Sequence, residues 1–437
     1  MFRKLLARGA LAAAAMLLVT GMAPANAAGG VGAGPITDVS HACKGQNAEV
    51  EQASWRRYVY VAWMGCNNSI GFARSADGGH TWSAPVVVPG SAGAWDPAVA
   101  VAPEGVLYVS FMNSNSTYTY PVVDTSFNFG RTFTQQPRLV PPDKNNWGDR
   151  DFIAAGAHGV LYLTWDYGPS AALVTDICTP GGSCAFATGD LNVVIQKSTD
   201  FGRTWAPMVH VSPGFPASGG DSAPLVVEPG GRIDMSYQGY NIYDLKTYAL
   251  TPAYTYFTSS ADGGQTWSPP VQVGPAAGTM SMAEWWIDGA IGRDSAGNLY
   301  ITWDTQGVGR DVGWLSYSAD RGRTWSAPVR VTPDNDNATH IVQVAGGPAG
   351  IAYVGWLADN SPHGYAQYLR TFSIGHGWLS GPLRISRQYG NAAIWPGDTF
   401  GISTWAGNGR SLVLSWGGAV GGSADSEIFA APVPVSG

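Results

Sequence analysis

Acidic residues recur at one kind of position in this chain, shortly before segments rich in β-branched and aromatic residues. They fall in five places, Trp95-Asp96, 147–151, Gly220-Asp221, 284–288 and 395–398, and Thr339-His340 takes the equivalent position in a sixth. Only 13% of the 437 residues are charged, so this recurrence is not typical of a random surface. Crowded carboxyl groups raise one another's pKa, which creates a proton donor suited to general acid catalysis.

Cleavage of a glycosidic bond is the chemistry that such a group of acids favours. It needs a proton donor with a raised pKa, together with a carboxylate or an activated tyrosine that stabilises positive charge at the anomeric carbon. We take Asp149, Asp151 and Glu284 as the catalytic candidates. Further residues of the same segments are candidates for substrate binding: Asp96, Asp221, Trp285, Trp286, Asp288, His340 and Asp398.

Each of these residue types also has a purely structural interpretation. The acids could cap backbone amides where the chain enters a strand, and the tryptophans, Trp95, Trp147 and Trp395 included, could pack between repeated units. A single histidine such as His340 or His363 is commonly just hydrogen-bonded. Either histidine could instead be the base of a polysaccharide lyase.

The elements that would position these residues repeat along the chain. A short β-type run, usually after a glycine and usually ending in an aromatic residue, occurs seven times. The runs are Tyr58 to Trp63, Gly105 to Phe111, Gly159 to Trp165, Gly231 to Tyr237, Gly297 to Trp303, Gly350 to Trp356 and Arg410 to Trp416. Seven such runs predict seven similar units.

A second repeat follows the first five runs. The phrases end at Trp82, Phe133, Trp205, Trp267 and Trp325 and fit the pattern Ser-x-Asp-x-Gly-x-Thr-Trp; a degenerate copy spans 373–378. The pattern resembles the Asp box of sialidases and other secreted β-propellers, and its spacing of about 50 to 70 residues suits propeller blades. The resemblance implies that the box joins the two outer strands of a blade, opposite the ligand face. Its acids, Asp77, Asp200, Asp262 and Asp320, should therefore not be catalytic.

We therefore expect an all-β fold with a single propeller of seven blades, with six as the alternative. The seventh unit lacks an outer strand, and the segment Gly34 to Ser40 resembles the outer strands of the other units. We expect this N-terminal segment to complete the last blade, because closing the ring pairs both exposed sheet edges.

Residues 1–27 read as a signal peptide: Arg3, Lys4 and Arg8 precede an apolar run that ends in Ala25-Asn26-Ala27. Residues 28–437 should then form one secreted domain, which we expect to be a monomer. The net charge of −7 and the absence of a basic stripe disfavour nucleic acid, and no second long apolar stretch predicts membrane insertion.

Four cysteines in an exported chain suggest two disulfides, Cys43 with Cys66 and Cys178 with Cys184. No metal site is predicted and no cofactor is required. The run 334–337 (Asp-Asn-Asp-Asn) resembles part of a calcium-binding loop but lacks the glycine and the final glutamate of an EF-hand. A turn is therefore favoured, and calcium stays an open alternative.

The sialidase resemblance also implies an arginine clamp for a substrate carboxylate and a tyrosine nucleophile assisted by a glutamate. Arg150, Arg310 and Arg387 fall on the expected ligand face, but the Phe-Arg-Ile-Pro motif of the family is missing. Tyr389 is the candidate nucleophile, and Tyr240 and Tyr243 are alternatives. The sequence thus favours a sialidase-like exo-glycosidase acting on an extracellular glycan, against a binding propeller or a polysaccharide lyase.

Overall fold

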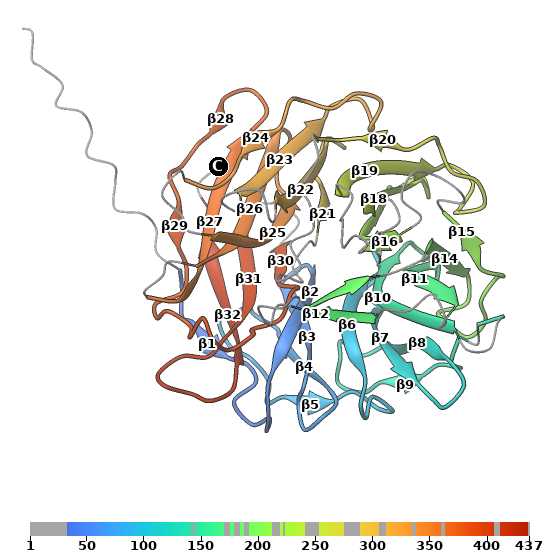
Figure 1. Cartoon of the computed structure of the whole chain (residues 1–437), viewed down its shortest axis with the longest axis horizontal. Helices are drawn as coiled ribbons and strands as arrows, with labels where there is room; N and C mark the ends of the chain where they lie inside the picture. Colours follow the sequence, from blue (N-terminus) through green and yellow to red (C-terminus); the bar gives the residue numbers. More distant parts are fainter. Residues whose placement is uncertain are drawn as a thin grey trace, which may run out of the picture. The chain divides into compact units, whose positions relative to one another are not determined.

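The structure is a computed structural model that describes residues 33–139, 141–142, 146–169, 175–178, 184–187, 192–211, 219–221, 223–240, 253–274, 289–305, 312–333, 338–359, 363–405 and 411–435. The predicted signal peptide lies outside these residues. Across the described ranges every regular element is a strand, and seven small antiparallel sheets form the blades of a β-propeller (Figure 1). No helix in the described ranges is long and apolar enough to cross a bilayer.

Each of the first three blades is a sheet of four strands, and in blade 3 a separate hairpin lies between the second and third strands in the sequence. Blade 1 holds β2 (Ala48–Trp55), β3 (Tyr58–Met64), β4 (Ile70–Ser75) and β5 (Val86–Val87). Blade 2 holds β6 (Trp95–Val101), β7 (Leu107–Ser114), β8 (Thr119–Ser126) and β9 (Thr134–Gln135). Blade 3 holds β10 (Asn146–Ala155), β11 (Leu161–Pro169), β14 (Asn192–Ser198) and β15 (Val209–His210), while β12 (Thr175–Cys178) and β13 (Cys184–Ala187) form a separate hairpin.

The next three blades follow the same order from the inside outwards. Blade 4 holds β16 (Gly219–Asp221), β17 (Leu225–Val227), β18 (Ile233–Tyr240), β19 (Ala253–Ser260) and β20 (Val271–Gln272). Blade 5 holds β21 (Ala290–Arg293), β22 (Leu299–Thr305), β23 (Val312–Ser318) and β24 (Val329–Arg330). Blade 6 holds β25 (Ala338–Gly346), β26 (Ile351–Asp359), β27 (Tyr365–Ser373), β28 (Gly377–Trp378) and β29 (Leu383–Arg384).

Both ends of the domain meet in blade 7, as the sequence predicts. The blade holds β30 (Gly401–Trp405), β31 (Ser411–Gly418) and β32 (Glu427–Pro434), and its outer strand is β1 (Thr37–Asp38) from the N-terminal segment. Thr37 pairs with Ala430, and the Gly34 amide donates a hydrogen bond of 2.7 Å to the carbonyl of Pro432. The predicted count of seven blades and the N-terminal closure are both confirmed.

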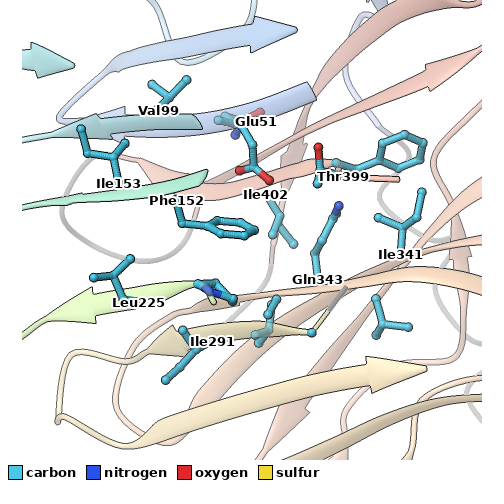
Figure 2. Close-up of a pocket in the computed structure, with 17 residues that line it drawn as sticks. Glu51, Val99, Phe152, Ile153, Leu225, Ile291, Ile341, Gln343, Thr399 and Ile402 are labelled. Carbon is cyan, nitrogen blue, oxygen red and sulfur yellow. The ribbon is translucent and has the colours of Figure 1, made fainter. Parts of the chain in front are cut away.

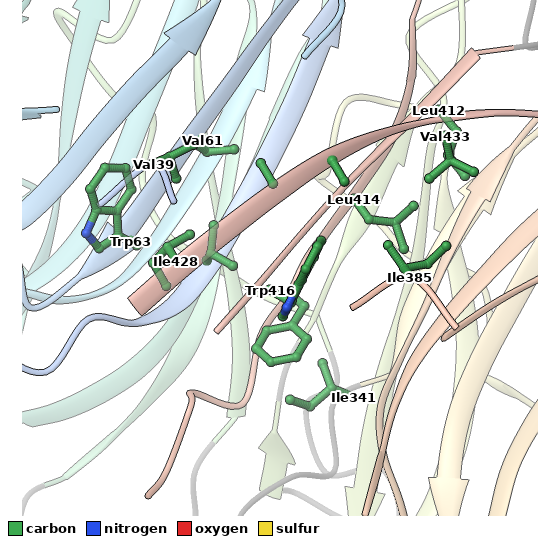
Figure 3. Close-up of a cluster of buried hydrophobic side chains, with 14 of the residues drawn as sticks. Val39, Val61, Trp63, Ile341, Ile385, Leu412, Leu414, Trp416, Ile428 and Val433 are labelled. Atoms are coloured by element: carbon green, nitrogen blue, oxygen red, sulfur yellow. The ribbon is translucent and has the colours of Figure 1, made fainter. Parts of the chain in front are cut away.

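Each sheet is covered on both faces by the neighbouring blades. Large apolar side chains from the second strands fill the spaces between the blades. Trp63, Trp165, Trp303 and Trp356 stand at matching positions near the ends of these strands and are fully buried. Burying one such side chain contributes about 4 to 6 kcal/mol of gross hydrophobic stabilisation. Figure 3 shows the largest cluster, where Trp63 and Trp416 belong to the packing that joins the first and last blades.

The repeated phrases form one type of turn between the two outer strands of a blade. In the first of them, Ser75 donates to Asp77 (2.7 Å), the Gly79 amide donates to Ser75 (2.8 Å), and both the amide and the hydroxyl of Thr81 donate to Asp77 (2.9 and 2.6 Å). The turns that begin at residues 126, 198, 260 and 318 repeat this pattern. Their acids are thus committed to local backbone bonding, as the sequence predicts.

The first predicted disulfide is confirmed. Cys43 and Cys66 are bonded, with their Cα atoms 4.7 Å apart, and they join the segment before β2 to the turn after β3. Cys178 and Cys184 are directly opposite each other in the β12–β13 pair. Their side chains lie outside the described part of the structure, so the second disulfide stays a prediction.

Candidate functional site

The mouth of the channel is the end at which the inner strands begin and the second strands finish. The paired ends Asn146 and Pro169 in blade 3 illustrate this arrangement. Four inner strands carry a bulge there, and each bulge holds one non-glycine residue at positive φ: Glu49 (50°), Asp96 (45°), Arg150 (53°) and Ile341 (53°). Such a backbone costs on the order of 1 kcal/mol for each residue. Bulges of this kind redirect side chains and are common next to binding sites.

Arg150 and Asp398 form a bidentate ion pair across the mouth. The two guanidinium NH groups of Arg150, in blade 3, donate to the two carboxylate oxygens of Asp398, at the start of blade 7, at 2.8 and 2.6 Å. Both side chains are buried. Paired charges with this fork geometry form strong, directional bonds, so each fixes the position of the other.

Three further carboxyl groups gather beside this ion pair. Asp96 accepts a hydrogen bond of 2.9 Å from the Arg150 amide, and its carboxyl group contacts those of Glu49 and Asp149. Asp149 also accepts a hydrogen bond of 2.6 Å from the Trp95 indole. Blades 7, 1, 2 and 3 therefore supply four carboxyl groups and one guanidinium to one side of the mouth.

Burial and mutual repulsion change the proton affinity of this carboxyl cluster. Burial is the main cause that raises the pKa of Glu49 well above its usual range, with Asp398 and Asp96 adding to it and Arg150 opposing it. Burial followed by the negative charge of Asp96 raises the pKa of Asp149 in the same way. Glu49 and Asp149 therefore hold their protons at a pH where exposed acids have lost them.

The position of Asp398 beside Glu49 depends on a glycine. Gly397 has φ of +105°, and a Cβ atom there would lie 2.1 Å from the Glu49 amide nitrogen. No side chain fits that space, and positive φ suits glycine. The close approach of the two backbones brings the acids of blades 7 and 1 together.

Of the other catalytic candidates, Asp151 lies within electrostatic reach of Asp96 but outside the hydrogen bonds of this carboxyl cluster, Tyr389 lies in blade 6, and Glu284 is not described. Asp151 is buried, with its carboxyl group facing the Ser110 hydroxyl of β7, and burial raises its pKa. Tyr389 lies near the outer part of blade 6, where its ring stacks on His363 at 5.4 Å and under the Arg384 guanidinium at 4.8 Å. Glu284 lies outside the described residues.

Several predicted binding residues cannot be placed by their side chains. Asp221 belongs to β16 and His340 to β25, and for both only the strand position is described. Trp285, Trp286, Asp288, Arg310 and Tyr243 lie outside the described residues, as does the run 334–337. The binding roles of Asp96, Arg150 and Asp398 stay predictions, although these three residues do meet at the mouth.

Two acids were missed in the sequence, Glu49 of the carboxyl cluster and Glu51 of the channel, and the first had a usable signal. Asp96 and Arg150 stand 15 residues before the aromatic that ends the β-type run of their blade (Phe111 and Trp165), and Glu49 stands at nearly the same distance, 14 residues, before Trp63. That spacing marks Glu49 as the equivalent residue of blade 1. Glu51, two residues further along, faces the channel, and no sequence signal distinguishes it.

The described residues offer no group of three or more His, Cys, Asp and Glu side chains arranged to hold a metal ion. In the carboxyl cluster at the mouth, the positive charge is supplied by the Arg150 guanidinium. The run 334–337 lies outside the described residues, so calcium binding stays an untested alternative.

Comparisons with known proteins relate the chain to others by fold alone. No protein-family model matches the sequence, and no curated protein matches it. An ulvan lyase, described as a new family of polysaccharide lyase, aligns with a TM-score of 0.60 at 14% identity, over 92% of this chain and 96% of that one.

Two glycoside-acting enzymes also share the architecture. Penicillium chrysogenum alpha-L-arabinanase complexed with arabinobiose gives a TM-score of 0.50 at 13% identity, over 93% of this chain and 97% of that one. Fusarium graminearum alpha-L-arabinofuranosidase in complex with an iminosugar inhibitor gives 0.50 at 12% identity, over 89% and 93%. The propeller fold is thus shared with glycoside hydrolases and a polysaccharide lyase.

Proposed function

We propose that this protein is a secreted exo-glycosidase of the Asp-box superfamily. The observation that carries the proposal is Asp149, a half-buried carboxyl group at the mouth whose pKa is raised by burial and by Asp96. A protonated carboxyl group in this position can donate its proton to a departing glycosidic oxygen. The hydrogen bonding of the five repeated turns supports the superfamily, and the Cys43–Cys66 disulfide supports secretion.

The second catalytic group must come from elsewhere in the mouth. Paired carboxyl groups of glycosidases are at least about 5 Å apart, whereas Asp96 contacts Asp149 directly. Asp96 is therefore assigned the role of raising the pKa of Asp149. Glu284, from the segment before β21, remains the candidate for the second group, acting directly or through a tyrosine.

We propose a neutral sugar as the substrate in preference to sialic acid. A sialidase needs arginines that bind the substrate carboxylate, and Asp398 already occupies the fork of Arg150. The remaining described groups of the cluster are carboxyls, which repel an anionic substrate once ionised. A sialidase-like site would require Arg310 and Arg387 to supply the clamp.

Mass spectrometry of products tests the proposal. The mature protein is incubated with neutral, sialylated and uronate-containing oligosaccharides, and a terminal neutral sugar released with one added water is the expected product. Asp149→Asn should lower turnover by at least about a hundredfold, the typical contribution of a general acid. Asp425→Asn is the matched control, since Asp425 is an exposed acid in a loop at the same end of blade 7. Full activity in the Asp149 variant would overturn the assignment.

A second candidate function is supported by the group formed by His363, Tyr389 and Arg384. A lyase removes the proton next to a uronate carboxylate; that electron pair forms a carbon–carbon double bond as the glycosidic oxygen leaves and takes a proton. A histidine can act as the base, a tyrosine as the acid, and an arginine can neutralise the carboxylate.

The same product analysis separates the two candidates, because a lyase product is unsaturated and gains no water. Loss of that product in His363→Ala, but not in Asp149→Asn, would favour the lyase. Binding of an oligosaccharide without any product would favour a binding propeller.

A further inference from the structure

The channel contains a cavity of about 210 Å³ that is separate from the carboxyl cluster at the mouth. Its wall comes from the inner strands or adjoining residues of all seven blades, and it presents both polar and apolar surface. None of Glu49, Asp96, Asp149, Arg150 and Asp398 lines it. Glu51 lies two residues beyond Glu49 on β2, or about 7 Å along an extended strand.

Four polar residues, Glu51, Gln52, Gln343 and Thr399, belong to this wall. Figure 2 shows Glu51, Thr399 and Gln343 extending into the same part of the cavity, with the ring of Phe152 beside them. They come from three separate segments: β2, the residues before β30, and β25. Their convergence is thus a product of the closed ring.

Gln343 is the residue that points to a ligand. It is 7% exposed, and neither its amide oxygen nor its amide nitrogen has a hydrogen-bond partner in the described part of the chain. Leaving a buried polar group unsatisfied costs about 1 to 3 kcal/mol. The described residues thus leave an unsatisfied amide at the wall of this cavity.

The chemistry of the wall limits the occupant. Burial raises the pKa of Glu51 to about 8, so at neutral pH this group is mostly an uncharged donor and acceptor. Its neighbours are an amide and a hydroxyl, which also both donate and accept. The cavity volume corresponds to about seven waters at about 30 Å³ each, which is room for one small ring.

We propose that this cavity binds one neutral sugar ring or cyclic polyol, with Glu51, Gln343 and Thr399 bonded to its hydroxyl groups and Phe152 against its apolar face. The site is distinct from the proposed catalytic mouth and does not depend on turnover. A monosaccharide held in the cavity is a released product or a regulator. The glycosidic bond that is cleaved lies at the mouth and not in this cavity.

Calorimetric titration with L-arabinose, D-galactose and myo-inositol tests the site in the mature protein. At least one of the three should bind, and Gln343→Leu and Thr399→Val should each weaken that binding about threefold to tenfold, the value of one hydrogen bond. Two variants are used so that a folding defect in one, detected by its unfolding temperature, does not decide the result.

Asp149→Asn separates this inference from the proposed function, because it should abolish turnover and leave the monosaccharide affinity unchanged. Failure of all three compounds to bind would overturn the inference and show a cavity that holds water only. Binding that is unchanged in both cavity variants but lost in the Asp149 variant would also overturn it, and would place the sugar at the mouth.

Discussion

Arg150 and Asp398 come from the third and seventh blades, yet their side chains meet in a buried, two-bonded ion pair. The pair lies beside the acids of blades 1 and 2, Glu49 and Asp96. The ion pair neutralises the positive charge that an anionic substrate would need. It also fixes Arg150, whose backbone amide donates a hydrogen bond to Asp96. The character of the site thus depends on this one contact.

Breaking the pair from one side should be more damaging than removing both partners. Asp398→Asn removes the negative charge that is bonded to both NH groups of the buried Arg150 guanidinium and should cost about 3 kcal/mol of unfolding free energy. The double variant Asp398→Asn with Arg150→Gln should recover about 2 kcal/mol of the summed losses. Urea unfolding of the four proteins measures this coupling, and strictly additive losses would show that the pair contributes nothing specific.

The pH dependence of turnover should report the proton on Asp149. Since the acid must be protonated, activity should fall as the pH rises through its raised pKa. Asp96→Asn removes a negative charge that contributes to this shift and should move the alkaline limb towards lower pH by up to about one unit. Asp425→Asn should leave the limb in place, and an unmoved limb in the Asp96 variant would contradict the proposed role of Asp96.

Asp124 should destabilise the protein at neutral and alkaline pH. It lies fully buried on β8 without a hydrogen-bond partner among the described residues, and burial raises its pKa to about 7. The unfolded chain has a pKa near 3.9, so this group lowers stability progressively between about pH 4 and pH 7. Asp124→Asn should be more stable than the parent at pH 8, by on the order of 2 kcal/mol. At pH 4 the two should be similar, and an equal difference at both values would point to packing instead of charge.

The repeated turns should contribute to stability and not to activity. Asp77→Ala removes the acceptor for Ser75 and Thr81 and should cost about 1 kcal/mol, as loss of a comparable helix cap does. Asp77→Asn should cost less, because Asn128 in the second turn accepts the same bonds from the serine hydroxyl and the threonine amide, and its amide group donates to the Thr132 hydroxyl. Thermal unfolding and turnover of both variants check this, and a large loss of activity at unchanged stability would contradict a scaffold role.

The Cys43–Cys66 disulfide should stabilise the first blade and the ring closure. It encloses a sequence separation of 23 residues, for which the chain-entropy model gives about 3 kcal/mol. The variant with both cysteines changed to serine should unfold at a correspondingly lower urea concentration. Equal midpoints for the variant and the oxidised parent would show that the N-terminal segment is held by β1 pairing alone.

Local patterns in the sequence determined the architecture. Each second strand carries an aromatic residue in its last half, and each repeated turn carries its own hydrogen-bonding side chains, so both repeats can be recognised within a few residues, and the first gives the number of blades. The missing strand of the last unit and the similar segment Gly34 to Ser40 predicted closure for the same reason. The Cys43–Cys66 pairing follows from the hairpin that the two residues flank.

Only the tertiary structure decided which acids act together. The sequence indicated that Asp96, Asp149, Arg150 and Asp398 lie at the same end of their blades. It did not indicate which residue each of them contacts. Partners such as Arg150 and Asp398 are 248 residues apart, and their contact depends on ring closure and on bulges that redirect the backbone. The cavity beneath the mouth has the same origin, because Glu51 and Gln343 look unremarkable in their strands until seven blades surround a common axis.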